Sequence, residues 1–413
     1  MVTMPDLYDR LESRVPQTRE TFLFRDLRHI LSITKSRVPA IRAQLKGIEI
    51  ASLTTRAELA RIPILRARDL AALQAETPPL GGLCATRPSA LKQIFATPGA
   101  IAVPEGKARD WWGAARALYV AGLRKGMIAV NCFSCELGPE ANMMASGAEA
   151  LGCPVMPLGV GALDFKVKAI AHVKPRFYCG TADHLKRILD HAVETGADVS
   201  TLKNGLVMGD FAPGLRNEIS LRGLHVKLAF ARPELGVVAF ESGATEGLTL
   251  NEGLILEFVD PGNGQTVEQG KPGEMVVTRL NPDYPLLRFG TGAVSAQLPH
   301  RSTCGRTNMR IRTPQELTAE NSECGGMRLY SSQLVEIAKR HPCLGRLRLI
   351  VRRSKEQDVL ILRAEHRGDE ACLSESLSET LHRVTQMRGT IELVSPGSLR
   401  DDESGIVDER HLN

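Results

Sequence analysis

Two cysteines, Cys132 and Cys135, lie at a spacing that can do chemistry, in the run MIAVNCFSC at residues 127–135. Paired thiols of this kind hold zinc when a second pair joins them, and otherwise serve redox exchange or nucleophilic catalysis. The run is a continuous apolar segment typical of a buried strand, and no second pair accompanies it, so we predict no metal site. Cys135 is a candidate catalytic nucleophile, and the alternative is a cysteine that packs in the core.

A second candidate is the stretch QIFATPGAIAVP, residues 93–104, in which a short apolar strand leads into a loop. Loops that hold phosphate groups supply backbone N–H groups, hydroxyls and a cation. Here Pro98 has no N–H, Ala100 and Ala102 carry no side-chain donor, and Val103 is a hydrocarbon. These residue types do not favour a tight polyphosphate site.

The composition describes an ordinary globular protein. The chain has 413 residues, 43% of them hydrophobic, which suggests roughly two or three domains with ample core. The net charge of +5 is spread along the chain, with neither a basic stripe nor interleaved aromatics, so nucleic-acid binding is not expected. Nine irregularly spaced cysteines indicate reduced thiols and a cytoplasmic protein. The chain starts without a secretion signal and contains no run apolar enough for a membrane span.

The elements that must position these residues alternate between strands and helices. Apolar residues at helical spacing predict amphipathic helices over residues 6–44, and residues 107–123 are predicted as a helix that carries both tryptophans, Trp111 and Trp112. Continuous apolar runs then predict buried strands, and these alternate with helices up to about residue 220. The pattern predicts an α/β fold with a mostly parallel sheet covered by helices on both faces. The predicted strands are residues 127–135, 153–159, 177–181 and 205–210, and the helices between them are residues 142–152 and 184–195.

The pattern changes in the last third of the chain. Short strands with turn signals from residue 254 predict a β-rich subdomain over residues 253–305. Residues 310–326 are polar, as expected for a hinge, and a small α+β unit follows. We therefore expect a large domain at residues 1–318 and a small mobile C-terminal domain at residues 319–413, with the boundary near Ala319.

The order of several motifs resembles the phenylacetate-CoA ligases of the adenylate-forming superfamily. The segment GAEALGCPVMPLGVG at residues 147–161 carries the family's Gly-Ala-Glu, Leu-Gly, Val, Pro, Gly pattern, and VKPRFYCGTADHL, GEMVVTRL and YPLLRFGTG follow in order. The resemblance covers nearly the whole chain. It implies the fold given above, including a mobile C-terminal domain.

The same resemblance implies that residues 93–104 replace the family's phosphate loop, a Ser-Ser-Gly-Thr-Thr-Gly-Lys-Pro motif. In that register Thr97, Gly99 and Pro104 remain, while the other hydroxyls and the lysine are absent. The family's catalytic lysine near the C-terminus is also absent, since residues 401–409 contain none. We expect that ATP and magnesium are not used and predict no cofactor.

Two further nucleotide motifs are altered. The family's Gly-Ala-Glu-Pro is replaced here by a motif that starts at Gly209 and places Phe211 beside the expected purine. The family's Tyr-Gly-Leu-Ser-Glu corresponds to the stretch from Phe230 to Glu234, which keeps the ring and the carboxylate. Glu234 is therefore a candidate catalytic or magnesium-binding residue, and the alternative is a surface carboxylate paired with Arg232.

A ribose-binding motif, Arg-Thr-Gly-Asp in the family, corresponds to the segment with Thr291 and Ala293 in this chain. A methyl group cannot accept the two hydrogen bonds that the aspartate accepts, at a cost of roughly 2–5 kcal/mol. Thr97, Gly99, Gly209, Glu234 and Thr291 thus form a remnant of a cofactor site.

The resemblance implies an acyl pocket whose expected substrate-binding residues are Phe133, Cys135, Phe211, Phe230 and Arg288. The leading hypothesis is an ATP-independent acyl transfer, condensation or cyclisation on a substrate carried by CoA or an acyl carrier protein. The alternatives are an atypical AMP-forming acyl-CoA or aryl-CoA ligase, in which Arg288 and other arginines hold the nucleotide differently, and a non-catalytic partner of an active ligase. We also expect a homodimer.

Overall fold

The computed structural model describes residues 6–97, 101–136, 138–243, 247–299, 302–316, 321–324, 327–354, 357–366, 371–399 and 405–410. The chain divides into two compact units, Met1–Gln315 and Glu316–Asn413. Ala319, where the sequence suggested the domain boundary, lies outside the described residues, and so does Gly99 of the predicted phosphate-loop remnant.

The first unit begins with helices that pack on one another and on a small sheet. The helix α1 buries Leu23, Leu27 and Leu31, which recur at helical spacing, against Ile255 and Leu287. The helices of this region are α1 (Pro16–Thr34), α2 (Pro39–Gln44), α3 (Arg56–Leu59) and α4 (Ala67–Glu76), with 3-10 turns η1 (Arg10–Ser13), η2 (Ile50–Ser52) and η3 (Pro88–Ala90).

An eight-stranded sheet forms the centre of the first unit, in the spatial order β13-β9-β8-β7-β6-β5-β3-β4. The strands β4, β3, β5, β6 and β7 are parallel, and β8, β9 and β13 continue the sheet in antiparallel pairs. The bounds are β3 (Ala129–Asn131), β4 (Val155–Pro157), β5 (Phe177–Gly180), β6 (Asn204–Met208), β7 (His225–Arg232), β8 (Gly236–Phe240), β9 (Leu248–Leu250) and β13 (Arg310–Ile311).

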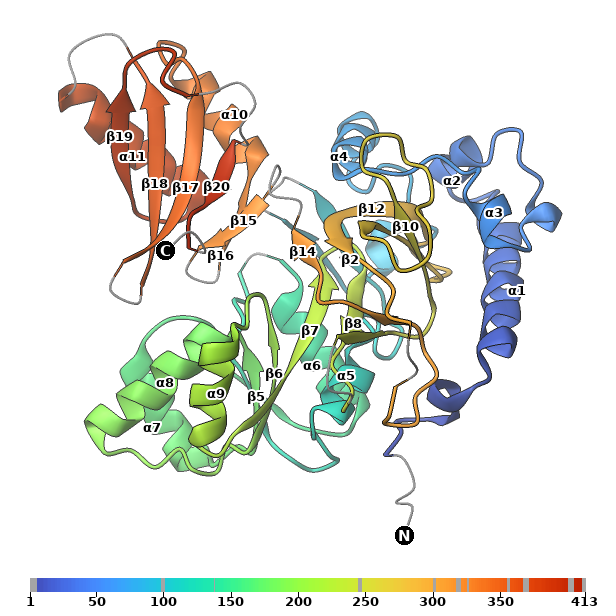
Figure 1. Cartoon of the computed structure of the whole chain (residues 1–413), viewed down its shortest axis with the longest axis horizontal. Helices are drawn as coiled ribbons and strands as arrows, with labels where there is room; N and C mark the ends of the chain where they lie inside the picture. Colours follow the sequence, from blue (N-terminus) through green and yellow to red (C-terminus); the bar gives the residue numbers. More distant parts are fainter. Residues whose placement is uncertain are drawn as a thin grey trace. The chain divides into compact units, whose positions relative to one another are not determined.

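Helices cover both faces of this sheet, because the connections from β3 to β4 and from β4 to β5 run in opposite directions. The pair α5 (Ala114–Val120) and α6 (Glu140–Ala150) lies on one face, and α7 (Leu163–Val173), α8 (Ala182–Thr195) and α9 (Pro213–Leu221) lie on the other (Figure 1). Gly147 lets α5 and α6 approach closely, since a Cβ there would lie 2.7 Å from the Ala114 Cβ. The predicted α/β fold with a mostly parallel sheet is confirmed.

The predicted helix over residues 107–123 is wrong in its first half. Trp111 and Trp112 precede α5, in a turn where Asp110 and Gly113 have positive φ angles of 51° and 68°. The Asp110 carboxylate then accepts the N–H groups of Ala114 and Ala115, which starts the helix at Ala114. The apolar residues keep a helix-like spacing in the sequence through this turn because both tryptophan rings are buried in the same core.

A second sheet of the first unit has the order β10-β11-β12-β14, and its strands β10 to β12 pair antiparallel. A separate hairpin, β1 with β2, precedes the large sheet in the sequence. The bounds are β1 (Gln93–Ala96), β2 (Ala102–Glu105), β10 (Leu254–Val259), β11 (Gly273–Arg279), β12 (Leu286–Ser295) and β14 (Gln315–Glu316).

The second unit is a small α+β structure with its own core around Leu349, Leu360, Leu377 and Leu381. Its sheet has the order β19-β18-β17-β20, and a hairpin of β15 and β16 precedes it. The bounds are β15 (Asn321–Cys324), β16 (Met327–Tyr330), α10 (Ser331–Arg340), β17 (Leu347–Ser354), β18 (Gln357–Glu365), α11 (Ala371–Thr385), β19 (Gly389–Val394) and β20 (Ile406–Asp408).

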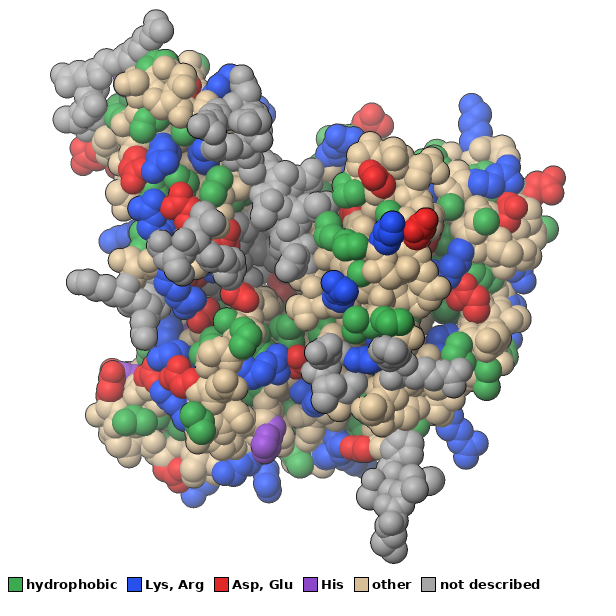
Figure 2. Space-filling model, viewed as in Figure 1, with side chains coloured by type: hydrophobic (Ala, Val, Ile, Leu, Met, Phe, Trp, Pro, Cys, Tyr) green, Lys and Arg blue, Asp and Glu red, His purple; other side chains and the backbone are tan. Residues whose placement is uncertain are grey.

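Basic and acidic side chains are interspersed over the face of the molecule shown in Figure 2. Across the residues that the structure describes, none of the helices combines the length and the apolar character that a bilayer crossing requires.

Candidate functional site

The carboxyl edge of the parallel strands is the candidate site. The chain runs from β3 outward to β4 and then returns to β5 on the other side of β3. In open α/β sheets, ligands bind at the carboxyl ends of strands next to such a reversal. Phe133 follows β3, Gly209 and Phe211 follow β6, and Phe230 comes one residue after the Met208–Ala229 pair of β6 and β7. The topology therefore brings these four predicted residues to one edge.

The loop after β3 is held by Asn131. The Asn131 Nδ2 atom donates to the Ala141 carbonyl at 2.8 Å, and the Phe133 N–H donates to Asn131 Oδ1 at 3.2 Å. Phe133 is 8% exposed, while Cys135 is exposed and its Sγ lies 3.9 Å from the Phe133 carbonyl. Burial raises the pKa of Cys132 to about 12, so of the two thiols only Cys135 is accessible for chemistry.

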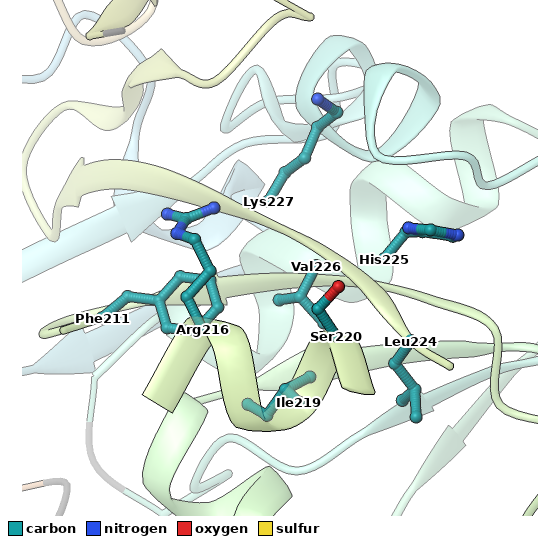
Figure 3. Close-up of a pocket in the computed structure, with 8 residues that line it drawn as sticks. All are labelled: Phe211, Arg216, Ile219, Ser220, Leu224, His225, Val226 and Lys227. Atoms are coloured by element: carbon teal, nitrogen blue, oxygen red, sulfur yellow. The ribbon is translucent and has the colours of Figure 1, made fainter. Parts of the chain in front are cut away.

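Phe211 lies in contact with an arginine. The Arg216 guanidinium is 4.1 Å from the centre of the Phe211 ring, and its two terminal nitrogens bind the Glu241 carboxylate at 2.7 and 3.1 Å. Phe211 and Arg216 line a groove of about 250 Å³ between α9 and β7 (Figure 3). Beyond Phe211, the groove has an apolar floor of Ile219, Leu224 and Val226, and His225, Lys227 and Ser220 complete its walls.

Glu234 lies in the tight turn between β7 and β8, where Arg232 pairs with Gly236. The residue is 8% exposed, so the interpretation of Glu234 as a surface carboxylate is wrong. Its carbonyl accepts a hydrogen bond from Arg279 Nη1 at 3.2 Å. The neighbouring Phe230 ring is 5.1 Å from the Arg232 guanidinium.

The β1–β2 hairpin corrects the register assumed for the phosphate loop. Ala96 pairs with Ala102 and Ile94 pairs with Pro104, so Pro104 belongs to a strand rather than to the loop. The connection between the strands is residues 97–101. Within it, the Thr97 N–H and hydroxyl both donate to the Ile101 carbonyl, at 2.9 and 3.2 Å.

Gln74 fixes the far end of this connection. Its side-chain amide donates to the Ala102 carbonyl at 2.8 Å and accepts the Ala102 N–H at 2.7 Å. Both backbone groups of Ala102 and both donors of Thr97 are thus occupied by contacts within the protein. The described residues of the connection are Thr97 and Ile101, and of their two backbone N–H groups only that of Ile101 is not used in these contacts.

Arg288 and Thr291 lie in β12, in the second sheet. The Arg288 side chain is 3% exposed; its Nε binds Glu257 at 3.0 Å, and its Nη1 donates to the carbonyls of Ala60 and Ile62. The Thr291 hydroxyl donates to the Met275 carbonyl at 2.9 Å. These contacts hold both side chains inside the protein.

Ala293, which stands at the expected ribose position, is 0% exposed. The irregular stretch of β12 before it is held by Glu274, which accepts the Gly292 N–H at 3.3 Å and forms an ion pair with Arg66. A Cβ at Gly290 would contact both members of that ion pair. The segment is therefore closely packed around a buried carboxylate.

A buried lysine and histidine near the carboxyl edge were not predicted from the sequence. Lys166 Nζ lies 2.6 Å from the Gly159 carbonyl and 2.8 Å from His184 Nε2, and the two residues are 1% and 7% exposed. Burial, together with the positive charge of Lys166, lowers the pKa of His184 to about 4. The neutral imidazole accepts from the lysine. The pair fixes Gly159, which follows β4. Only burial in the folded chain distinguishes Lys166 and His184 from ordinary helix residues.

The described residues contain no group of three or more His, Cys, Asp or Glu side chains arranged to hold a metal ion. A magnesium ion bound with ATP would need the phosphate oxygens as further ligands. Glu234, the magnesium-binding candidate that the resemblance suggested, is itself largely buried and lies in the turn between β7 and β8.

Comparisons with known proteins define the class of this fold. The structure of 2-hydroxyisobutyryl-CoA ligase in complex with 2-HIB-AMP and CoA matches with a TM-score of 0.87, covering 98% of this chain and 92% of that one at 22% identity. An amide bond synthetase from Marinactinospora thermotolerans matches with a TM-score of 0.60 over 94% of this chain and 93% of that one, at 14% identity. The fold is that of the adenylate-forming ligases.

Similarity in sequence is narrower. The phenylacetate-coenzyme A ligase of Thermus thermophilus is 28% identical over 295 residues, 67% of this chain and 66% of the relative, so the chain spans just under two thirds of its length. The phenylacetate-coenzyme A ligase of Aromatoleum evansii is 24% identical over 78% of this chain and 75% of its own. No protein family model matches the chain. The predicted resemblance to phenylacetate-CoA ligases is confirmed as similarity.

Proposed function

We propose that this protein acts on an acyl group carried by, or transferred to, a thiol such as that of CoA. The similarity to phenylacetate-CoA ligases supports an acyl substrate, and the structural neighbour in complex with CoA supports the thiol. Phe133, Phe211 and Phe230 lie at the carboxyl edge of the sheet and suit an apolar or aromatic acyl group.

We further propose that the step proceeds without ATP. The observation that carries this proposal is the short β1–β2 connection, in which the Thr97 N–H and hydroxyl are both used by Ile101. A triphosphate carries several negative charges and needs many donors at its binding loop. The buried Ala293 and the absence of lysine from residues 401–409 support the same view. The substrate would then arrive already activated as a thioester, on CoA or on an acyl carrier protein.

A second candidate function is AMP-forming ligation of an acid to CoA. The named activities of the relatives favour it, and the fold match extends over 98% of the chain. In that case the nucleotide would be held by contacts other than those of the usual loop. A third possibility, a non-catalytic partner of an active ligase, is favoured by no specific contact.

Two measurements on the purified full-length chain separate these functions. Isothermal titration with ATP and magnesium should give no binding at concentrations up to the millimolar range, while phenylacetyl-CoA should bind. Carboxylate-dependent exchange of pyrophosphate into ATP, tested with phenylacetate and a panel of other acids, would establish the ligase instead. Binding of neither ATP nor any acyl-CoA of the panel would favour the non-catalytic partner.

Variants locate the acyl site. Phe133→Ala should weaken binding of phenylacetyl-CoA by about 10-fold or more, since removing a buried ring costs at least about 1.4 kcal/mol. Phe165→Ala is the matched control, because Phe165 is 66% exposed on α7 and its loss should leave affinity unchanged. Equal effects of the two variants would place the acyl group elsewhere.

A further inference from the structure

Two loops at the carboxyl edge of the large sheet are joined through Asn131, the last residue of β3. Its carbonyl accepts the backbone N–H groups of Leu158 at 2.8 Å and of Gly159 at 3.2 Å, which follow β4. Its side chain accepts the Phe133 N–H at 3.2 Å. A Cβ added at Gly159 would lie 4.0 Å from the Phe133 carbonyl oxygen, so the two loops lie side by side. The position of Phe133 therefore depends on the backbone that follows β4.

Lys166 of α7 and His184 of α8 hold this backbone. Gly159 has a positive φ of 60°, a conformation that glycine adopts at little cost, and its carbonyl accepts from Lys166 Nζ at 2.6 Å. The same ammonium lies 2.8 Å from His184 Nε2, in the first turn of α8. The Thr181 hydroxyl accepts the His184 N–H at 3.3 Å and caps that helix directly after β5. A continuous series of contacts thus runs from the end of β3, through the residues after β4, to the helix that follows β5.

Packing alone does not explain a lysine at this position. The side chain is almost fully buried, and burial lowers the pKa of Lys166. Among the described residues, the titratable groups that act on it besides His184 are the neutral thiol of Cys132 and the positive Arg187, and neither is a carboxylate. The charged groups that act on His184 are Lys166 and Arg187. A buried cation without a carboxylate is costly, whereas an apolar side chain would pack without that cost. Such groups are typical of functional sites.

We propose that Lys166 and His184 are positioning residues of the acyl site: by holding the Gly159 carbonyl they keep Phe133 where its ring packs against the acyl group. This proposal rests on the proposed function, in which Phe133 binds an apolar or aromatic acyl group. Neither residue needs to contact the substrate, since both act through the backbone that follows β4. Loss of either residue should therefore weaken binding of an aromatic acyl group more than binding of an acetyl group, which has no ring to pack against Phe133.

The first test measures the affinity of the purified full-length chain for phenylacetyl-CoA and for acetyl-CoA by isothermal titration. Lys166→Met removes the ammonium and should weaken binding of phenylacetyl-CoA by about 3- to 10-fold, which does not exceed the loss expected for Phe133→Ala. The affinity for acetyl-CoA should change by less than about 2-fold, because little apolar area is buried by a methyl group. Lys168→Met is the matched control, since Lys168 is exposed on the same helix and its loss should change neither affinity.

A double-mutant cycle separates positioning from a general effect on stability. If Lys166 acts through Phe133, then adding Lys166→Met to Phe133→Ala should have little further effect on the affinity for phenylacetyl-CoA, so the two losses should not add. A residue that only stabilises the fold would change the affinity of the wild type and of Phe133→Ala by the same factor. Additive losses, or equal losses for phenylacetyl-CoA and acetyl-CoA, overturn the proposal.

His184 allows a test with a conservative variant. His184→Gln places an amide oxygen near the position of Nε2, where it can accept from Lys166, and should keep the affinity for phenylacetyl-CoA within about 2-fold. His184→Leu has no acceptor and should weaken this binding as Lys166→Met does. Tryptophan fluorescence melts show which variants are folded. A folded His184→Leu that binds phenylacetyl-CoA as tightly as His184→Gln does would refute the role of the pair.

Hydrogen exchange of the wild-type protein decides the question if neither Lys166→Met nor His184→Leu folds. The N–H groups of Leu158 and Gly159 bind the Asn131 carbonyl, so an acyl group that packs on Phe133 should slow their exchange. Saturating phenylacetyl-CoA should protect the peptide of residues 156–161 more than saturating acetyl-CoA does. Equal protection by the two ligands would remove this proposal and leave the proposed function standing. Binding of neither ligand to the wild type would overturn the proposed function and this proposal with it.

Discussion

The ion pair between Arg288 and Glu257 allows a sharp test of the structural role of an arginine that the sequence suggested as a substrate ligand. The two side chains are 3% and 2% exposed, and their contact is 3.0 Å. Arg288→Met removes the charge and leaves the Glu257 carboxylate buried without its partner. Breaking one member of a buried pair costs about 3–5 kcal/mol.

The effect can be expressed as a melting temperature. The first unit, Met1–Gln315, should unfold with an entropy of about 0.66 kcal/mol/K, at about 2.1 cal/mol/K for each residue. A loss of about 4 kcal/mol then lowers its melting temperature by about 6 °C. Tryptophan fluorescence reports this unit specifically, because the chain's two tryptophans, Trp111 and Trp112, both lie within it and are buried.

The controls isolate the pair. Arg61→Met breaks the exposed contact with Glu58 at 2.9 Å and should cost less than about 1 kcal/mol. Adding Glu257→Gln to Arg288→Met removes the stranded charge and should recover much of the loss. If Arg288→Met melted like Arg61→Met but no longer bound phenylacetyl-CoA, the structural reasoning would fail and the substrate role would stand.

The pH dependence gives an independent check. Burial raises the pKa of Glu257, although Arg288 lowers it. An acid whose pKa is higher in the folded state than in the unfolded state loses stability as pH rises. Without Arg288 the pKa of Glu257 rises further, so the stability that Arg288→Met loses relative to the wild type should be larger at pH 7 than at pH 5. A deficit that is independent of pH would contradict the proposed cause.

Three further outcomes follow from other buried groups. Gln74→Leu leaves both backbone groups of Ala102 without their partners and should cost about 2–3 kcal/mol, seen as a fluorescence melt about 3–5 °C lower; an unchanged melt would mean that water replaces the amide. The pKa of His184 is about 4, below its unfolded value near 6.5, so the free energy of unfolding should fall by up to about 3 kcal/mol as pH drops from 6.5 to 4. In urea titrations, His184→Gln should make the free energy of unfolding depend less on pH over this range. Burial raises the pKa of Asp110 to about 6 despite its hydrogen bonds. Asp110→Asn should therefore stabilise the protein by about 1 kcal/mol at pH 8 and by less at pH 5. Destabilisation at pH 8 would show that the N–H groups at the start of α5 need the charged carboxylate.

The fold class was predictable because each parallel strand is a continuous apolar run between helices. Such runs are buried on both faces of a sheet whatever the connections. The helix at Trp111 and Trp112 was predicted too long, because the backbone of Asp110 and Gly113 reverses the chain there. Apolar spacing records burial of the two rings and carries no information about those φ angles.

The candidate site was predictable in part. Phe133, Gly209, Phe211 and Phe230 reach one edge because residues at or after the carboxyl ends of successive parallel strands must do so. Lys166 and His184 gave no signal, since each is an ordinary helix residue until α7 and α8 pack together. The register of the β1–β2 connection was also beyond the sequence, because strand pairing decides which residues form the loop.

The sequence by itself determined the alternation of strands and helices, the similarity to acyl-CoA ligases and the residue types at the positions where the resemblance places the nucleotide motifs. Tertiary structure alone decided that Arg288 is held by Glu257 and that Lys166 joins Gly159 to His184. The physical reason is that residue type sets what a group can donate or accept, whereas pKa and binding depend on burial and on partners that are distant in the chain.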